Sequence, residues 1–165
     1  MKTLVTYTSQ TGNTKRLAEA IYNAIPGDKE IKTIKEVESL DDYGLTFIGY
    51  PVNSGAPAKD AKRFIGKKAE GKKIAMFVTH ATPTGMAPLE DIIKKCKAVG
   101  ENSDTVGFFE TQGELSEKIA NMLVNAPDPN MQAFGKMREK TVGKPDEIAL
   151  EEARKWATDI VQKNS

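Results

Sequence analysis

Short apolar runs that end at turn residues alternate along the chain with segments whose apolar residues recur every three or four positions. The short runs predict strands, and the helical spacing predicts helices. The predicted strands are Lys2–Thr8, Glu30–Lys35, Gly44–Tyr50, Ile74–Thr79 and Thr105–Phe109. The first predicted helix begins at Asn13 and is closed by Pro26-Gly27. The other predicted helices are Ala58–Lys68, Leu89–Val99, Ser116–Val124 and Pro145–Gln162. A less regular stretch that starts at Asn125 separates the last two helices.

This alternation predicts an α/β fold, in which a doubly wound parallel sheet of five strands carries helices on both faces. The length of 165 residues suits a single domain over residues 1–165. In such a sheet a ligand binds beyond the carboxyl ends of the strands, where the strand order reverses. We therefore expect the binding site in the loops that follow the strands, which are Thr8–Thr14, Pro51–Pro57, His80–Ala87 and Glu110–Gly113.

Composition excludes several classes of protein. The net charge of +1 gives no overall field that would attract nucleic acid or a lipid surface. No apolar run is long enough for a transmembrane helix, and the N-terminus enters a strand pattern rather than a signal-peptide pattern. The single cysteine, Cys96, excludes an internal disulfide, so the expected compartment is the cytoplasm. Its helical spacing with Ile92 and Val99 predicts that Cys96 is a core residue.

The first loop is rich in hydroxyl and amide side chains and has no positive charge before Lys15. Ser9, Thr11 and Thr14 offer hydroxyl donors, and Gly12 permits a close approach of the backbone. A helix N-terminus adds its partial positive charge, so such a loop can bind a phosphate group without a lysine. The alternative is a plain N-cap, because serine, threonine and asparagine are common there.

The loop also lacks the sequence patterns of two nucleotide-binding folds. Gly-x-x-x-x-Gly-Lys-Ser/Thr is absent, which disfavours a nucleotide triphosphatase, and Gly-x-Gly-x-x-Gly is absent, which disfavours a dinucleotide-binding fold. A phosphate monoester on a small organic body is the ligand that fits. No cluster of metal-ligating residues is visible in the sequence.

The segment Ser9-Gln10-Thr11-Gly12-Asn13-Thr14 resembles the phosphate loop of the flavodoxin family, whose pattern is Thr/Ser-x-Thr-Gly-x-Thr after the first strand. The segments FIGYPVNSGAPAKDAKRFI and MFVTHATPTG are similar to the two flavin-contacting loops of that family. FFETQGELSEKIANML and GKPDEIALEEARKWA resemble the closing segments of a short, flavodoxin-like subgroup found mainly in anaerobes. The resemblance implies a five-stranded sheet of order 2-1-3-4-5 and noncovalently bound FMN.

The resemblance also implies which residues bind the cofactor. These are Ser9, Gln10, Thr11, Gly12, Asn13 and Thr14 in the first loop; Tyr50, Pro51, Val52, Asn53, Ser54 and Gly55 in the second; and Thr79, His80, Ala81, Thr82 and Gly85 in the third. Family members usually hold the ring between aromatic side chains, and this sequence departs from that pattern. Its only tryptophan, Trp156, lies on the apolar face of the last helix and is expected in the core. Pro83 and Met86 are further candidates beside the ring.

Two of the predicted contacts with the flavin each have an alternative interpretation. The family places a backbone carbonyl near flavin N5 in the second loop, and Gly55, or its peptide with Ser54, is the candidate; the alternative is a glycine that serves only the turn. His80, the only histidine, could cover the ring or place a charge near flavin N1. The alternative is a loop histidine whose ring is satisfied by a backbone carbonyl.

The expected function is that of an electron carrier: a monomeric FMN protein that passes one or two electrons to or from larger redox enzymes. It could serve as the flavin subunit of a reductase, such as a bilirubin or other tetrapyrrole reductase. One alternative is an FMN-dependent NAD(P)H or quinone reductase. Another is a flavodoxin-fold binding module that has lost its flavin. The methionine-bearing excursion Asn121–Met137 could cover the flavin edge, meet a partner or fill the core.

Overall fold

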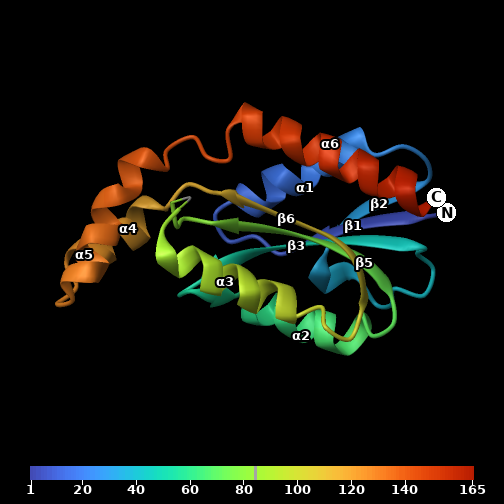
Figure 1. Ribbon diagram of the computed structural model, residues 1–165, viewed down its shortest axis with the longest axis horizontal. Coiled ribbons are helices and arrows are strands. Elements are labelled where there is room, and N and C mark those ends of the chain that lie inside the picture. Colours follow the sequence, from blue (N-terminus) through green and yellow to red (C-terminus); the bar gives the residue numbers. More distant parts are fainter. Residues whose placement is uncertain (84) are drawn as a thin grey trace.

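The computed structural model describes residues 1–83 and 85–165 and has a parallel sheet at its centre (Figure 1). Five parallel strands run in the order β2-β1-β3-β5-β6. Their bounds are β1 Thr3–Tyr7, β2 Lys29–Thr33, β3 Leu45–Asn53, β5 Lys73–His80 and β6 Asp104–Gln112. The short β4, Ala56–Pro57, pairs antiparallel with β3. Counted without β4, the strands have the order 2-1-3-4-5, so the predicted fold class is confirmed.

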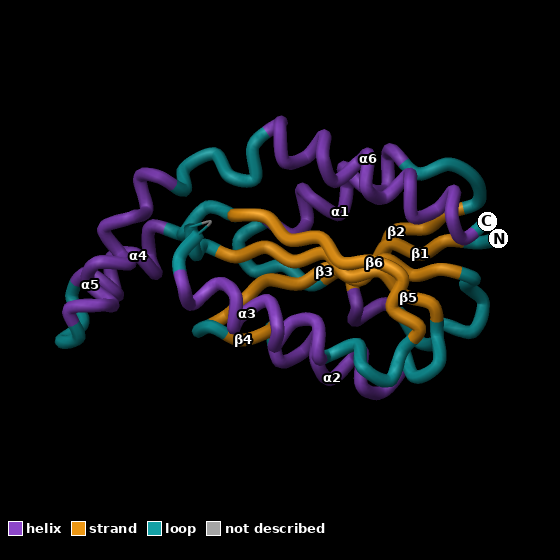
Figure 2. Tube along the Cα trace, viewed as in Figure 1, coloured by secondary structure: helices purple, strands orange, loops and turns teal. Residues whose placement is uncertain are grey.

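Helices cover both faces of the sheet (Figures 1 and 2). The helices α1 (Asn13–Ala24) and α6 (Glu147–Asn164) pack on one face, and α2 (Lys59–Lys68) and α3 (Ala87–Ala98) pack on the other. Side chains alternate along each strand, so Leu4 enters the core under α2 and α3 while Val5 enters the core under α1 and α6. None of the helices in the described residues is both long and apolar enough to cross a membrane.

Trp156 and Cys96 lie in these two cores, as predicted. The indole of Trp156 packs between Phe47 and Phe109, with ring centroids 5.6 Å and 5.5 Å apart. The thiol of Cys96 is fully buried, and this burial raises its pKa to about 12. Neither side chain is therefore available to a ligand at the edge of the sheet.

Three strands run further at their carboxyl ends than the sequence pattern predicted, and one of them is β5, which ends at His80 rather than Thr79. The strand β3 continues from Tyr50 to Asn53, because its last two residues pair with β4 in a tight hairpin. The strand β6 continues to Gln112, because its end pairs with the end of β5. These extensions carry Pro51, Val52, Asn53 and His80 on strand ends rather than in loops, which gives their backbones defined partners.

The stretch after β6 contains one predicted helix and one that was missed. The predicted helix is α4 (Glu117–Val124), with Ser116 as its N-cap, and the missed one is α5 (Pro129–Lys136), followed by a 3₁₀ turn, Met137–Lys140. At the start of α5 the side chain of Asp128 accepts a hydrogen bond from the backbone N–H of Asn130 (2.8 Å). Pro129 occupies the first helical turn, where proline is favoured. Within the stretch that the sequence pattern left irregular, Pro129 therefore marks a helix start.

The close contact between β3 and β5 gives a stability prediction. A Cβ on Gly49 would lie 2.0 Å from the ring of Phe77, which is fully buried and cannot move aside. We expect Gly49→Ala to lower the free energy of unfolding by about 2–3 kcal/mol. The control is Gly66→Ala on the exposed face of α2, where a Cβ meets nothing within 4 Å; it should raise stability by about 0.5–1 kcal/mol. Urea unfolding measures both, and equal midpoints for the two variants would contradict the packing argument.

Candidate functional site

The first loop wraps around Gly12, which is the N-cap of α1. Gly12 has a φ of 95°, in the left-handed region that favours glycine, and no side chain caps the helix. The backbone N–H of Gly12 donates to Oγ of Ser9 (3.1 Å), so Ser9 accepts there and keeps its own O–H as a donor. Since no side chain fills the cap, the plain N-cap alternative does not describe this loop.

The start of α1 therefore presents free donors to whatever lies in front of it. The first intrahelical bond is donated by Arg16 N–H to the Gly12 carbonyl (3.0 Å). Within the described chain, the backbone N–H groups of Thr11, Asn13 and Thr14 have no acceptor. A Cβ built on Gly12 meets nothing within 4 Å, so the turn is open on that side. Orphan N–H groups and the positive end of a helix are the two features that favour anion binding at a helix start.

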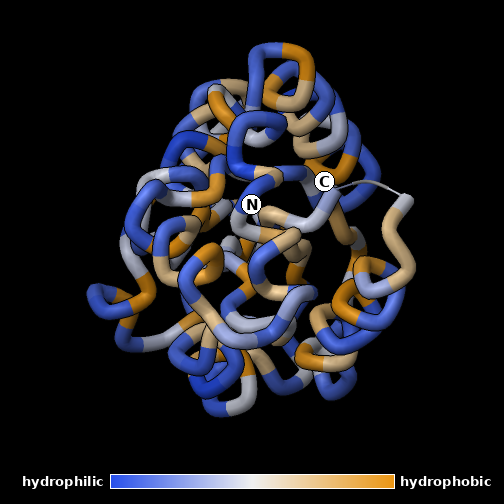
Figure 3. The backbone as a smooth tube through the Cα atoms, turned by 90° about the vertical axis from the view of Figure 1, so that its left-hand side faces the viewer, coloured by the Kyte–Doolittle hydropathy of each residue, from blue (hydrophilic) through white to orange (hydrophobic). Residues whose placement is uncertain are grey.

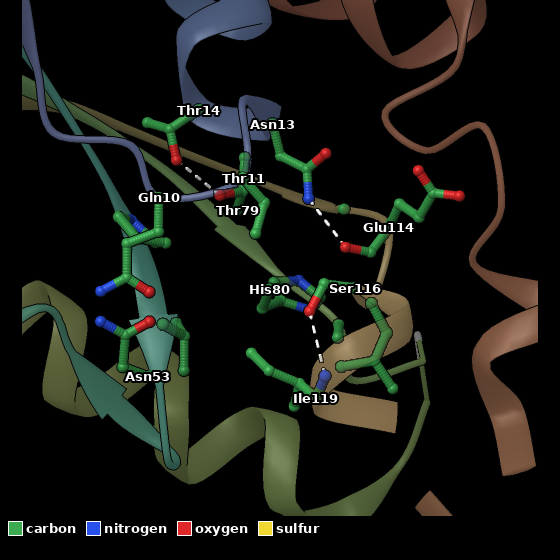
Figure 4. Close-up of a pocket in the computed structure, with 15 residues that line it drawn as sticks. Gln10, Thr11, Asn13, Thr14, Asn53, Thr79, His80, Glu114, Ser116 and Ile119 are labelled. Atoms are coloured by element: carbon green, nitrogen blue, oxygen red, sulfur yellow. Dashed lines mark hydrogen bonds between the residues drawn. The ribbon is translucent and has the colours of Figure 1, made fainter. Parts of the chain in front are cut away.

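Two side-chain hydrogen bonds tie this loop to the ends of neighbouring strands (Figure 4). The hydroxyls of Thr14 and Thr79 are 2.8 Å apart and buried, which joins α1 to the end of β5. Nδ2 of Asn13 donates to the carbonyl of Glu114 (2.9 Å), which joins α1 to the segment after β6. These two bonds hold the first loop against the end of β5 and against the segment that follows β6.

The second loop is the two-residue turn between β3 and β4. Asn53 pairs with Ala56, and the two residues between them, Ser54 and Gly55, both have positive φ values of 50° and 76°. Two left-handed residues in a two-residue hairpin are the signature of a type I′ turn. Ser54 is the only non-glycine with positive φ among the described residues, so the shape of this turn is held by the hairpin rather than by its sequence.

The third loop follows β5 and starts at a buried histidine. His80 is 4% exposed, and its Nε2 pairs with the carboxylate of Glu110 on the adjacent strand β6. This hydrogen bond from His80 holds the pKa of Glu110 below its ordinary value, against the opposing effect of burial. Nδ1 of His80 is buried and has no partner within residues 1–83 and 85–165. The ring is therefore satisfied on one side by a carboxylate, and neither sequence alternative foresaw that partner.

These loops enclose two adjoining cavities. The first is lined by the start of α1, the ends of β3 and β5, and the segment Gly113–Ser116 (Figure 4). The second, of about 680 Å³, lies beyond the β3–β4 turn and the end of β5 and is bounded by α4 and α5. Its volume is in the range of small-molecule sites. Both cavities are lined by Gln10, Val52, Asn53, Ala81, Leu115 and Ile119, so they share a wall, and together we call them the cleft.

Most of the predicted site residues line this cleft. They are Gln10, Thr11, Asn13, Thr14, Pro51, Val52, Asn53, Ser54, Gly55, Thr79, His80, Ala81 and Thr82. Ser9 and Gly12 shape the first loop without lining the cleft. Gly85 and Met86 are exposed just before α3, and Pro83 is half-buried. Thr84 lies outside the described residues.

Tyr50 is corrected by the structure. Its side chain is fully buried, its hydroxyl donates to the carbonyl of Cys96 (2.9 Å), and it lines neither cavity. Desolvation raises the pKa of the phenol, which stays neutral. Side chains alternate along β3, so Tyr50 points into the core under α3 while the adjacent Pro51 reaches the first cavity. Tyr50 therefore belongs to the core, and we leave it out of the proposed site.

The cleft also contains residues that were not individually predicted to bind the cofactor, although Gly113 lies in an expected loop and four others lie in the excursion Asn121–Met137, which could cover the flavin edge. They are Ile92, Gly113, Glu114, Leu115, Ser116, Ile119, Leu123, Asn130, Met131 and Phe134. All but Ile92 belong to the excursion after β6 or to its approach. The sequence indicates their place at the site only through the position of the excursion, which follows a strand whose carboxyl end faces the site.

The residues present fit a phosphate ester with an apolar body. The free N–H groups at α1 suit the dianion, and the 680 Å³ cavity beyond them is lined mainly by apolar side chains. No carboxylate lies within Ser9–Thr14 or Pro51–Pro57 to repel an anion. This pairing of an anion site with an adjoining apolar cavity is what a flavin mononucleotide requires.

Comparison with known proteins assigns the chain to a family. Residues 4–158 match the family model described as a flavodoxin domain. The chain is 31% identical over 175 aligned positions to the flavodoxin-like domain-containing protein BilS of Clostridioides difficile (strain CD3), covering 100% of this chain and 99% of that protein. The chain therefore belongs to the flavodoxin family, as the sequence resemblance indicated. Family membership indicates FMN as the cofactor.

Solved structures of low identity share the fold. A flavodoxin from the domain Archaea is similar with a TM-score of 0.61 and 22% identity, over 99% of both chains. A flavoprotein from Lactobacillus acidophilus NCFM, crystallised in complex with FMN, is similar with a TM-score of 0.53 and 22% identity. That match covers 66% of this chain and 92% of the flavoprotein.

The pair of His80 and Glu110 gives a prediction about pH. His80→Ala removes the hydrogen bond that lowers the pKa of Glu110, so this pKa should rise to or above its ordinary value of 4.5. In the unsubstituted protein the stability from this pair is complete above that ordinary value and is lost as the pH falls through the lowered pKa. The difference in unfolding free energy between the two proteins should therefore shrink as the pH falls from about 7 to about 3.

Carboxyl ¹³C NMR titration of Glu110 measures the shift directly, and urea unfolding at several pH values measures its effect on stability. An unchanged Glu110 titration in His80→Ala would contradict the pairing.

Proposed function

We propose that this protein is an FMN-dependent electron carrier whose phosphate site is the loop Ser9–Thr14. The observation that supports it best is the uncapped start of α1. Gly12 turns the backbone at the start of the helix, and Thr11, Asn13 and Thr14, whose backbone N–H groups are free, line the cleft. This arrangement binds the phosphate by hydrogen bonds and the helix end, without a lysine.

The roles of the loop residues follow from their contacts. Thr11 is exposed and free to donate its hydroxyl, and Ser9 has a free O–H beside the turn. Thr14 is buried against Thr79, so one of these two hydroxyls donates to the other and the second proton remains for the ligand. The side-chain amide of Asn13 donates to the carbonyl of Glu114, so Asn13 offers its backbone N–H to the phosphate.

The remaining loops are proposed to hold the ribityl chain and the ring. Gln10 in the phosphate loop and Asn53 at the β3–β4 turn line both cavities, and their side chains face each other (Figure 4). The peptide between Ser54 and Gly55 is proposed to present its carbonyl to flavin N5, since the positive φ of both residues leaves this peptide at the tip of the turn. His80, held by Glu110, is proposed to lie beneath the ring as a fixed polar group.

The carrier function is supported by the family and by what the site contains. The bound flavin would supply the redox chemistry, and the chain's residues bind it and limit its contact with water. The proposed partners are larger redox enzymes. A narrower form of the proposal is that the protein is the flavin subunit of a reductase such as a bilirubin or other tetrapyrrole reductase. That form is supported by resemblance to the short, flavodoxin-like subgroup.

A second candidate is an FMN-dependent NAD(P)H or quinone reductase. The cavity of about 680 Å³ favours this function, because the space could admit a substrate beside the ring.

The third candidate is a binding module without flavin. The uncapped phosphate loop disfavours it, because a module without the cofactor has no need to keep this loop open.

The phosphate site predicts how FMN and riboflavin compare. FMN should bind far more tightly than riboflavin, and inorganic phosphate should compete with FMN. Gly12→Ala should weaken FMN binding about 10- to 100-fold and leave riboflavin unchanged, because charge-assisted hydrogen bonds to the phosphate are lost. Titration of flavin fluorescence measures these affinities.

The control variant is Gly27→Ala. Gly27 also has positive φ (86°) and open space around its Cβ position, but it lies in the turn after α1, away from the cleft. Both substitutions strain a left-handed residue by about 1–2 kcal/mol, and only Gly12→Ala should change FMN affinity. Equal affinity of the protein for FMN and riboflavin would refute the phosphate site.

Carrier and reductase are distinguished by steady-state turnover. The FMN-loaded protein alone should oxidise NADPH and NADH no faster than free FMN does, with or without a quinone, because a carrier needs a separate enzyme to load its electrons. Chemically reduced protein should still pass electrons rapidly to an artificial acceptor. Saturable oxidation of either nucleotide by the purified protein would establish the reductase instead.

A further inference from the structure

The hairpin formed by α4 and α5 stands beyond the carboxyl ends of the strands, at one end of the molecule (Figures 1 and 2). Hydrophobic and hydrophilic stretches alternate along the chain when the molecule is viewed from that end (Figure 3). Several large apolar side chains of the hairpin are exposed, including Ile119 (42%), Met122 (65%) and Met131 (49%). Helices of eight residues are marginal by themselves, so this hairpin needs packing partners.

The base of the hairpin is closed and fixed to the sheet. The N–H of Leu115 donates to Oγ1 of Thr141 (2.9 Å) in a buried bond, and the N–H of Glu114 donates to the carbonyl of Lys144 (2.9 Å). The Glu114 carbonyl in turn accepts from Asn13 in the phosphate loop. A short path of hydrogen bonds thus joins the phosphate loop to the base of the hairpin.

The two helices pack closely on one another. A Cβ on Gly135 would lie 2.8 Å from the carbonyl oxygen of Ala120 and 2.9 Å from a methyl carbon of Val124. Only a glycine permits α5 to approach α4 at this position. The adjacent residue, Phe134, is thereby placed on the side of α5 that lines the larger cavity.

The inner face of the hairpin lies across the cavity from the flavin loops. Ile119, Leu123, Met131 and Phe134 line one side, and Val52, Gly55, Thr82 and Ile92 line the other. The space between them, of about 680 Å³, is lined mainly by apolar side chains. An apolar, planar group of ligand size would remove both surfaces from water.

Phe134 is the one phenylalanine, tyrosine or tryptophan that lines either cavity in the described part of the chain. Tyr50 is committed to the carbonyl of Cys96, and Trp156 is packed between Phe47 and Phe109. The β3–β4 turn and residues 80–83 contain no such side chain. The aromatic contact that the flavin loops lack is available from the hairpin alone.

We propose that the α4–α5 hairpin is a wall of the flavin site, in which Phe134 contacts the isoalloxazine ring and Ile119, Leu123 and Met131 complete an apolar surface beside it. This proposal rests on the proposed FMN function and adds to it a second structural element that binds the ring. Since the hairpin base is bonded to Asn13, phosphate binding and ring binding hold the same unit in place.

The test compares ring binding in three variants. Phe134→Ala should weaken the binding of FMN and of riboflavin by the same factor, about 10-fold or more, because the ring is common to both ligands. Competition by inorganic phosphate should persist. Phe134→Leu should lie between Phe134→Ala and the unsubstituted protein. Met122→Ala, on the exposed side of the same hairpin, should leave both affinities unchanged.

Hydrogen exchange supplies a readout that does not depend on a variant. FMN should protect the amides of α4 and α5 in the unsubstituted protein, and riboflavin should do so at saturation. If neither flavin protects these amides, or if Phe134→Ala binds both flavins normally, another occupant fills the cavity and the proposal is wrong. If the unsubstituted protein binds no FMN at all, the proposed function fails as well. That result differs from normal flavin binding without protection of the hairpin, which would overturn only the role of the hairpin.

Discussion

The left-handed turn at Gly12 is the constraint on which the rest of the site depends. It starts α1 without a side-chain cap and turns the first N–H groups of the helix toward the cleft. The same turn sets the positions of Asn13 and Thr14, whose side chains reach Glu114 and Thr79. One backbone conformation therefore fixes the anion site and aligns the segments that follow β5 and β6.

The fold could be predicted because its signals are local and repeated. Five apolar runs and the helices between them determine a parallel sheet, and the rule of right-handed crossovers leaves few ways to connect it. The phosphate loop was predictable for a similar reason, since its chemistry lies in six consecutive residues. The ends of the strands were less predictable. The strand β3 extends to Asn53 only because β4, which follows it after a two-residue turn, pairs with its last residues.

The parts that were missed depend on registers and contacts that no single segment encodes. Tyr50 and Pro51 are neighbours in sequence, but the pleat of β3 sends one to the core and the other to the cleft. The pairing of His80 with Glu110 requires the register between β5 and β6, which includes an irregularity after Ile74. The helix α5 was hidden because Pro129 is a breaker inside a helix and a favoured residue at its start.

The closed base of the α4–α5 hairpin has a consequence for how this fold varies. Leu115 and Thr141 are joined by one hydrogen bond, so the chain leaves the sheet and returns to it at nearly the same point. A segment inserted between such ends can lengthen, shorten or be exchanged with little strain on β6 or α6, since loop-closure entropy grows only slowly with length. Evolution can therefore alter the wall of the larger cavity by replacing this one segment, while the sheet and the start of α1 stay unchanged.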